Sequence, residues 1–264
     1  MLEINKIHQG DCLELMKNLP NNYAQLTITS PPYNVGGNNM NYRAKHKYDG
    51  NKEHDDNKSD YFKWLSERFS EMLRCSKYVF LNIQMLAKNK KDVLRLIAAN
   101  QEYLKDIIIW GKKNPPPAME QGVMNSGFEF ILIFSKERPD KRKFYDCDFR
   151  GTVGNIIMTA VNRNEFASIH KAVFPLEIPE YIIKNFSKKG QIILDPFMGV
   201  GTTAAACKKL NRSYIGFEVS AEYCQVAEKR LRETEVPLDV FDKKEVAIPP
   251  IDKSVGILAN DLYE

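Results

Sequence analysis

The chain has 264 residues, of which 43% are hydrophobic, and its 38 Lys and Arg residues outnumber 34 Asp and Glu residues by four. This composition is typical of a globular protein and excludes a disordered, collagen-like or coiled-coil architecture. A net charge of +4 lies in the range of ordinary soluble domains, so it does not by itself indicate a nucleic-acid partner. At this length we expect one α/β domain.

The sequence has no run of about 18 apolar residues, the length that a membrane span needs, and its start lacks the apolar run of a signal peptide. We therefore expect a cytoplasmic protein without membrane contact. The five cysteines are odd in number and never form C-x-x-C, which argues against disulfides and against a zinc site. We expect no metal, and four of the five thiols occur in apolar or helical contexts typical of buried cysteines.

Short apolar runs alternate with segments of helical period, a pattern that predicts βα units and a mostly parallel sheet. Residues 24–29 are predicted to be a strand, which ends where two prolines cannot donate hydrogen bonds. Apolar side chains recur at helical spacing from Tyr61 to Leu73, after a start marked by Ser59 and Asp60. Further strands are predicted at residues 78–81, 107–110 and 128–134.

The last third repeats the alternation. The pattern predicts a helix at 178–186, a strand at 191–194, a helix from about 202, a strand at 214–217 and a helix that Ser220 caps and that ends near 232. After Glu235 the prolines and charges predict an extended tail. Two polar stretches, residues 34–57 and 137–168, show no period, and loops of such length are commonly functional or disordered, so both are candidates for substrate contact.

Residues 192–203 run from a predicted strand through a glycine turn into a helix. Gly199 and Gly201 allow a tight turn and a close approach of the backbone to a ligand. About 20 residues later the next strand ends at Glu218, whose carboxylate can bind the two hydroxyls of a ribose. Asp195 would repel a pyrophosphate but could pair with an ammonium group. These features favour S-adenosylmethionine, which has a ribose and an amino group but no phosphate; the alternative is a glycine turn that serves packing only.

The segment from Thr29 to Asn34 follows the first predicted strand at its carboxyl end, where open α/β sheets place their chemistry. Two prolines fix the backbone so that the Ser30 hydroxyl and the Pro31 carbonyl can face one donor, while Tyr33 offers a flat ring for a base. Two acceptors on the hydrogens of an exocyclic amino group favour a tetrahedral nitrogen whose lone pair can attack a methyl group. The alternative is an ordinary surface turn at Ser30, Pro31, Pro32 and Tyr33.

With both motifs in this order, the sequence resembles the amino-methylating DNA methyltransferases of bacterial and phage restriction-modification type. The order matches their permuted arrangement (beta class), in which the catalytic motif precedes the cofactor motif. The resemblance extends from about Ile4 to Leu231, and it is carried by residues 10–16, 29–34, 170–179, 195–203 and 218–224.

The resemblance implies a doubly wound, Rossmann-like α/β fold that binds S-adenosylmethionine. We divide the chain into a methyltransferase domain, residues 1–235, and a tail, residues 236–264. Within the domain, residues 1–136 are the catalytic half, 137–168 a target-recognition insert and 169–235 the cofactor half. The implied cofactor-binding residues are Asp11, Phe174, Pro175, Asp195, Phe197, Gly199, Gly201, Thr202 and Glu218.

Individual roles also follow from the resemblance. Asp11 is expected at the adenine of the cofactor, Glu218 at its ribose, and Asp195, Phe197, Gly199 and Gly201 at its methionine moiety. Phe174 and Pro175 are expected to wall the site, with His170 and Lys171 at its mouth. Two alternatives stay open here: His170 as a structural histidine, and Asp11 as the cap of a helix at residues 13–19.

In this family Ser at the first catalytic position is more common among cytosine-N4 enzymes, and Asp among adenine-N6 enzymes, so Ser30 favours cytosine N4 over adenine N6. Carbon-5 methylation is disfavoured because the sequence lacks the Pro-Cys nucleophile that it requires. A base within double-stranded DNA would have to be flipped out to reach the motif. Basic side chains in the insert are expected to contact the DNA, unless they form a solvated charge run: Arg138, Lys141, Arg142, Lys143 and Arg150.

Two other functions fit the sequence less well. A methyltransferase for RNA or for a protein amide could use the same clamp, but those relatives usually carry the catalytic motif after the cofactor motif. A binding module without activity is disfavoured because Ser30, Tyr33, Asp195 and Glu218 are all present. The short insert suggests a homodimer, with apolar residues 156, 157, 158 and 161 either in a self-complementary patch or in a buried strand.

Overall fold

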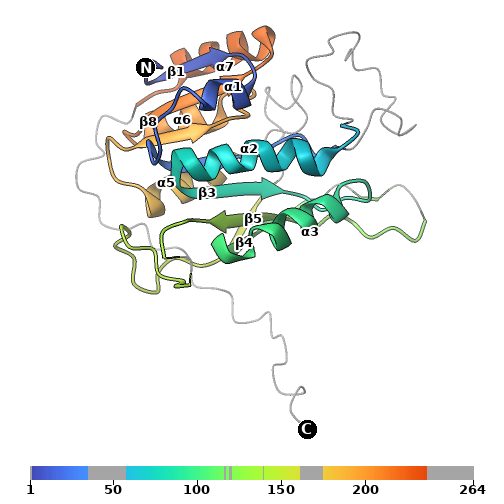
Figure 1. The fold of residues 1–264 in the computed structure, drawn as a ribbon. Coiled ribbons are helices and arrows are strands. Elements are labelled where there is room, and N and C mark those ends of the chain that lie inside the picture. Colours follow the sequence, from blue (N-terminus) through green and yellow to red (C-terminus); the bar gives the residue numbers. More distant parts are fainter. Residues whose placement is uncertain are drawn as a thin grey trace.

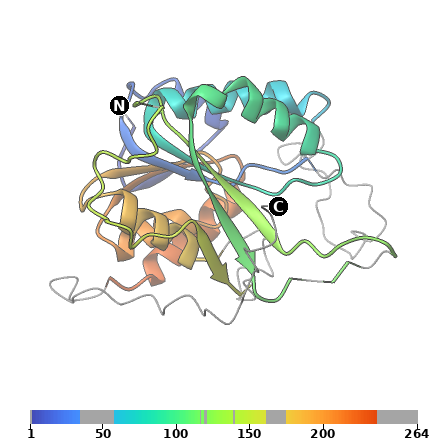
Figure 2. The same cartoon turned by 90° about the horizontal axis from the view of Figure 1, so that it is seen from below.

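The structure is a computed structural model, and it describes residues 2–34, 58–115, 117–118, 121–138, 140–160 and 175–236. One eight-stranded sheet lies between two layers of helices (Figure 1 and Figure 2). The predicted doubly wound, Rossmann-like α/β fold is confirmed.

The sheet has the strand order β1-β8-β7-β2-β3-β5-β4-β6. Only β5 runs antiparallel to its neighbours, β3 and β4, while every other adjacent pair of this sheet is parallel. The expectation of a mostly parallel sheet is therefore confirmed. The strands are β1 (Lys6–Gln9), β2 (Ala24–Thr29), β3 (Ser76–Ile83), β4 (Leu104–Lys112), β5 (Phe128–Phe134), β6 (Ile156–Thr159), β7 (Ile192–Asp195) and β8 (Ser213–Glu218).

The helices cover both faces of the sheet. On one face lie α1 (Cys12–Met16), α2 (Tyr61–Cys75) and α3 (Lys90–Ala99), and on the other α5 (Glu177–Phe186), α6 (Thr202–Lys209) and α7 (Ala221–Glu233). A short 3-10 helix, Gln101–Tyr103, leads into β4. Successive side chains of a strand point to opposite faces, so in β3 Tyr78 and Phe80 join one hydrophobic cluster, and Val79 and Leu81 the other.

The predicted strands and helices are present, with ends that differ from the prediction by a few residues. Sequence patterns did not predict β1 or α3, and they predicted a strand at β6 only as one of two alternatives. In β1 only Ile7 is buried, and in α3 only Val93 and Leu96, so neither segment has a broad apolar pattern. β6 is a four-residue strand at the sheet edge, where one face meets solvent.

The apolar run in β6 is partly buried and partly exposed, so each of its two predicted alternatives holds for part of it. Ile157 is buried in the core, whereas Ile156 is 65% and Met158 52% exposed. Val161 lies outside the described residues. The run is therefore partly an edge strand of the core and partly an exposed apolar surface.

The structure also bears on the cysteines and on membrane contact. Cys12, Cys75, Cys207 and Cys224 are buried, as predicted for four of the five thiols, and Cys147 is half-buried. In the described ranges, no helix has the length and apolar character needed to cross a bilayer. Within the same ranges, no group of three or more His, Cys, Asp and Glu side chains is placed to hold a metal ion.

Gly201, which precedes α6, should be the most constrained glycine of the cofactor turn. Its φ is +81°, and a Cβ there would lie 2.9 Å from the Ala227 Cβ. Gly190 has nearly the same φ, +79°, but a Cβ there would meet nothing within 4 Å. We expect Gly190→Ala to lower the free energy of unfolding by about 1 kcal/mol through backbone strain alone. Gly201→Ala should lower it by about a further 1–3 kcal/mol because of the overlap.

Urea unfolding of the two variants and the wild type measures both costs. Equal destabilisation by Gly190→Ala and Gly201→Ala would contradict the close packing of the turn against α7.

Candidate active site

The predicted catalytic and cofactor motifs meet at the carboxyl edge of the parallel strands. Ser30 follows β2, Asp195 ends β7 and Glu218 ends β8, while Gly10 and Asp11 follow β1. β2 lies beside β7, and β7 beside β8, so the three strand ends are neighbours. The fold therefore brings together motifs that are far apart in the sequence.

Asp195 joins the two motifs directly. Its carboxylate accepts hydrogen bonds from the Thr29 hydroxyl at 2.7 Å, the Thr203 hydroxyl at 2.6 Å and the Phe197 amide at 3.0 Å. The side chain is 1% exposed. Two of these bonds go to Oδ1 and one to Oδ2, so an acceptor position is left on Oδ2. The predicted contact between Asp195 and the cofactor amino group stays a prediction that would use this remaining position.

Burial raises the pKa of Asp195 to about 6, against the opposing effect of its three hydrogen bonds, and the nearby Glu218 carboxylate adds to the rise. The neutral form is thus favoured at a higher pH in the folded protein than in the unfolded chain. This carboxylate is held at the turn at a cost in stability near neutral pH.

Glu218 organises the other side of the glycine turn. Its two carboxylate oxygens accept backbone hydrogen bonds from Gly199 at 2.8 Å and from Ser220 at 2.9 Å. Each oxygen keeps a second lone pair, which is the acceptor pattern that a ribose diol needs. A Cβ on Gly199 would meet nothing within 4 Å, so the turn leaves space for a ligand. These residues fit the ribose and backbone contacts expected for S-adenosylmethionine.

Asp11 combines a capping role with an ion pair. Its carboxylate accepts from the Leu13 amide at 2.8 Å, which caps α1, and from Arg68 Nη2 at 2.7 Å. The Asp11 side chain is 47% exposed, and that of Arg68 9%. The capping alternative is confirmed, and the predicted contact of Asp11 with the cofactor adenine stays a prediction.

Aromatic side chains lie beside the turn. Phe197 packs against Trp64 of α2, with ring centroids 5.6 Å apart, and Arg68 lies 4.4 Å from the centroid of the Trp64 ring. Trp64 and Arg68 were not predicted to lie here. In the sequence they appear only as one apolar and one charged residue of an amphipathic helix.

The structure describes only some of the remaining residues that were predicted at the cofactor site. Thr202 is buried at the start of α6, where its hydroxyl accepts a hydrogen bond from Arg230 at 2.8 Å. Pro175 is buried just before α5. Phe174, His170 and Lys171 lie outside the described residues.

The catalytic motif is hydrogen-bonded to residues of β3 and β5, and through Glu129 it is connected to Lys112 of β4. The Ser30 hydroxyl lies 2.9 Å from the Tyr33 hydroxyl, which donates to Glu129 at 2.8 Å. Asn82 Nδ2 lies 2.8 Å from both Tyr33 Oη and Glu129 Oε2. Lys112 pairs with the other oxygen of Glu129 at 2.8 Å. Pro31 is buried, and the carbonyl of the exposed Pro32 accepts from Tyr61 at 2.6 Å.

Sequence reasoning missed Asn82, Lys112 and Glu129. A signal was present, since Asn82 and Glu129 are single polar residues within otherwise apolar strands. A polar side chain in such a strand needs a partner when it is buried. Both side chains are indeed buried, and they are each other's partners.

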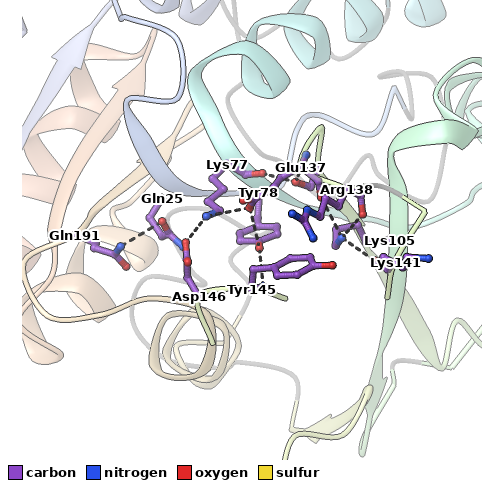
Figure 3. A network of polar contacts seen from close by, with 11 residues as sticks. Gln25, Lys77, Tyr78, Lys105, Glu137, Arg138, Lys141, Tyr145, Asp146 and Gln191 are labelled. Carbon is purple, nitrogen blue, oxygen red and sulfur yellow. Dashed lines mark hydrogen bonds and ion pairs between the residues drawn. The ribbon is translucent and has the colours of Figure 1, made fainter. Parts of the chain in front are cut away.

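The basic residues predicted to contact DNA lie elsewhere. Because β5 is antiparallel, the chain leaves it at the amino edge of the sheet, opposite to Ser30. There Lys105, next to the start of β4, donates to the carbonyls of Glu137, Arg138 and Lys141 (Figure 3). Arg142 pairs with Asp106 at 2.6 Å, also near the start of β4.

The same region contains the other basic residues that were predicted to contact DNA. Lys143 and Arg138 both lie over the Tyr145 ring, and Arg150 is exposed. A cavity of about 670 Å³ opens at this amino edge, lined by Gln25, Lys77, Glu137 and Gln191 among others. The fold does not bring Arg138, Lys141, Arg142 or Lys143 to the catalytic edge, and their contact with DNA stays a prediction.

The ends of the first polar stretch are joined near the catalytic motif. The Lys58 amide donates to Asn34 Oδ1 at 2.6 Å, and Asn34 Nδ2 donates to the Lys58 carbonyl at 3.4 Å. Residues 35–57 lie outside the described residues. Asn34 and Lys58, which flank them, therefore lie side by side next to Tyr33.

The raised pKa of Asp195 predicts a specific pH dependence of stability. A folded-state pKa above the unfolded value contributes stability at low pH that is lost as the pH rises through about 6. Asp195→Asn keeps the shape and removes this titration. The stability advantage of the wild type over Asp195→Asn should therefore fall by about 2 kcal/mol between pH 4 and pH 7.5. Urea unfolding across this range measures the difference, and a constant or growing advantage would contradict the assignment.

Comparison with known proteins places the chain in a family. A family model described as DNA methylase, of the N6/N4 type, matches residues 24–229. The chain is 28% identical over 253 residues to the type II methyltransferase M.HinfI of Haemophilus influenzae, covering 87% of this chain and 69% of that protein. It is 26% identical over 271 residues to the type II methyltransferase M1.MboII of Moraxella bovis, covering 89% of this chain and 100% of that protein.

Solved structures show the same fold. The cytosine-N4-specific PvuII DNA methyltransferase superposes with a TM-score of 0.65 at 19% identity, covering 85% of each chain. The complex of M1.HpyAVI with S-adenosylmethionine superposes with a TM-score of 0.60 at 24% identity, covering 86% of this chain and 98% of that one. The family match spans both motifs of the carboxyl edge, and the protein accordingly belongs to the N6/N4 DNA methylase family, as an S-adenosylmethionine-dependent DNA amino-methyltransferase.

Proposed function

We propose that the protein methylates one base within a specific sequence of double-stranded DNA, as the modification enzyme of a restriction-modification system. Cytosine N4 is the favoured target atom, and adenine N6 is the alternative. The observation that carries the proposal is the bond between Thr29 and Asp195, which fixes Ser30 beside the glycine turn. A base held at Ser30 and a cofactor held at the turn would then be neighbours.

The chain's own residues divide the work. Glu218 would bind the ribose hydroxyls, Gly199 and Gly201 would let the backbone approach the ligand, and Phe197 would form an apolar wall. When bound, S-adenosylmethionine supplies a methyl group on a positively charged sulfur. Ser30 and the Pro31 carbonyl would accept the hydrogens of the target amino group, and the Tyr33 ring would stack on the flipped base.

Acceptance of these hydrogens prepares the nitrogen for attack. With its hydrogens held by two acceptors, the nitrogen becomes more tetrahedral and its lone pair leaves conjugation with the ring. The nitrogen forms a bond to the methyl carbon as the carbon–sulfur bond breaks, and the bonding pair stays on sulfur. The nitrogen then loses one proton to water. The preference for cytosine rests on Ser30, in keeping with the family tendency described above.

The face that meets DNA follows from this geometry. A duplex whose flipped base reaches Ser30 must approach the carboxyl edge of the sheet. We infer that the duplex is contacted mainly by the loops at this edge, including the segment between β4 and β5. The basic residues of the amino edge are less favoured contacts. A homodimer also stays a proposal, and of the described residues of its expected surface Ile156 and Met158 are exposed, whereas Ile157 is buried.

Product analysis tests the base. The purified protein, incubated with S-adenosylmethionine and plasmid DNA from a methylation-deficient strain, should yield N4-methyldeoxycytidine, measured by mass spectrometry of the digested nucleosides. N6-methyldeoxyadenosine alone would overturn the cytosine preference but keep the amino-methylation. Absence of both methylated nucleosides across several DNA sources of different sequence would contradict the proposed function.

A substitution at Glu218 tests the cofactor site. Glu218→Ala should weaken binding of S-adenosylmethionine by about 1–3 kcal/mol, because the ribose hydroxyls lose their acceptor. Glu222→Ala, at an exposed position in the first turn of α7, is the matched control and should bind normally. Calorimetry measures both affinities, and unfolding without cofactor shows whether the variants are folded. Unchanged affinity in a folded Glu218→Ala protein would contradict the ribose assignment.

A further inference from the structure

A chain of buried polar contacts lies behind Ser30, and the predicted roles of the catalytic motif leave it unused. It runs from Ser30 through Tyr33 to Glu129, and from Glu129 to Lys112. The Glu129 and Lys112 side chains are 9% and 11% exposed. Three strands contribute to it, since Asn82 lies on β3, Lys112 on β4 and Glu129 on β5.

The chemistry of these groups fixes the direction of each hydrogen bond. A carboxylate only accepts, so Tyr33 spends its single hydroxyl proton on Glu129. Tyr33 Oη then acts as an acceptor toward Ser30, and Ser30 must donate its own proton to Tyr33. Asn82 donates to both Tyr33 and Glu129. Burial and the neighbouring Glu129 raise the pKa of Tyr33 well above its ordinary value, so the tyrosine keeps the proton that it donates.

The ion pair with Lys112 explains why Glu129 can be a carboxylate here. A buried charge is costly unless it is paired and hydrogen-bonded. Glu129 has the Lys112 ammonium on one oxygen and the Tyr33 and Asn82 donors on the other. Lys112 in turn lies 5.3 Å from the centroid of the Trp110 ring.

We propose that Glu129 is a positioning residue for methyl transfer, which acts through Tyr33 to orient the Ser30 hydroxyl. With its proton directed at Tyr33, and with Asn82 Nδ2 donating to it over a longer distance of 3.4 Å, Ser30 keeps a lone pair for the amino group of the target base. The same arrangement prevents Ser30 from donating to the ring nitrogen next to that amino group. This inference rests on the proposed function, because it assigns Ser30 an acceptor role in that reaction.

Asn82 provides an independent sign that the cluster receives a donor. Its side chain is 4% exposed, and its Oδ1 has no hydrogen-bond partner within the described part of the chain. The amide is oriented by its donor side, because turning the oxygen toward Glu129 would place two acceptors together. An unpartnered acceptor beside Ser30 and Tyr33 is suited to a donor that arrives with the substrate.

The test is a double-mutant cycle between Glu129 and Tyr33. Glu129→Gln keeps the size of the side chain and removes its charge, and Tyr33→Phe keeps the ring and removes the hydroxyl. Methyl transfer is measured under single-turnover conditions with tritiated S-adenosylmethionine and plasmid DNA from a methylation-deficient strain. Each single variant should be at least 10-fold slower than the wild type, with unchanged affinity for S-adenosylmethionine by calorimetry.

Coupling between the two positions gives the decisive readout. Because Glu129 acts through the Tyr33 hydroxyl, the double variant should be no slower than the slower single variant. If instead the two losses multiply, Glu129 acts independently of Tyr33 and the proposal is wrong. Glu129→Gln or Tyr33→Phe at the wild-type rate would also overturn it. Should Glu129→Gln fail to fold, Tyr33→Phe at the wild-type rate would still overturn the proposal, and Glu129→Asp takes the place of Glu129→Gln in the cycle.

Glu71→Gln is the matched control. Glu71 pairs with Arg74 at 2.7 Å near the end of α2, and neither residue belongs to the predicted site. The same chemical change there should leave the transfer rate unchanged, and an equal loss there would overturn a specific role for Glu129. The wild-type arm separates the two proposals. A wild type without transfer contradicts the proposed function and the inference with it, whereas an active wild type with an equally active Glu129→Gln contradicts only the inference.

Discussion

The hydrogen bonds of one buried carboxylate hold the two halves of the site together. Asp195 binds the end of β2 through Thr29 and the start of α6 through Thr203, although Thr29 and Asp195 are 166 residues apart in the chain. The catalytic motif and the cofactor turn are thus parts of one rigid junction. This junction costs stability, because burial removes the Asp195 carboxylate from water and raises its pKa to about 6. The fold thus loses stability at the place where the catalytic motif and the cofactor turn are held relative to each other.

Two further carboxylates at this edge are also buried and hydrogen-bonded, but their partners are different. Glu218 is held by backbone amides alone and keeps lone pairs for a ligand, whereas Glu129 is neutralised by a lysine and faces a hydroxyl chain. The three acids therefore differ in what they can still accept. Asp195 joins the two motifs, whereas Glu218 is proposed to bind the ribose and Glu129 is proposed to orient Ser30.

Local patterns in the sequence predicted much of this arrangement and missed a definable part. The strand before Ser30, the helix that Asp60 caps and the turn at Gly199 are all encoded by nearby residues, and the structure contains them. The antiparallel direction of β5 depends on pairings such as Trp110 with Glu129, which no local pattern encodes. This reversal brings Glu129 to the catalytic edge and takes the chain after Phe134, with Arg138 and Arg142, to the opposite edge. The position of Glu129 beside Tyr33 and the position of these basic residues away from Ser30 thus have a single cause.

The two hydrogen bonds between Asn34 and Lys58 determine how costly a change in the length of the intervening segment is. Asn34 has a φ of +56°, which its short polar side chain tolerates, and its side-chain amide fastens the point where the chain returns. With the ends fastened, each doubling of the intervening length costs only about 0.6 kcal/mol of closure entropy. A segment of different length or composition can thus be exchanged at this point while the junction at Asp195 stays intact. The length of the chain between Asn34 and Lys58 and the geometry of the junction at Asp195 are therefore physically separable in this fold.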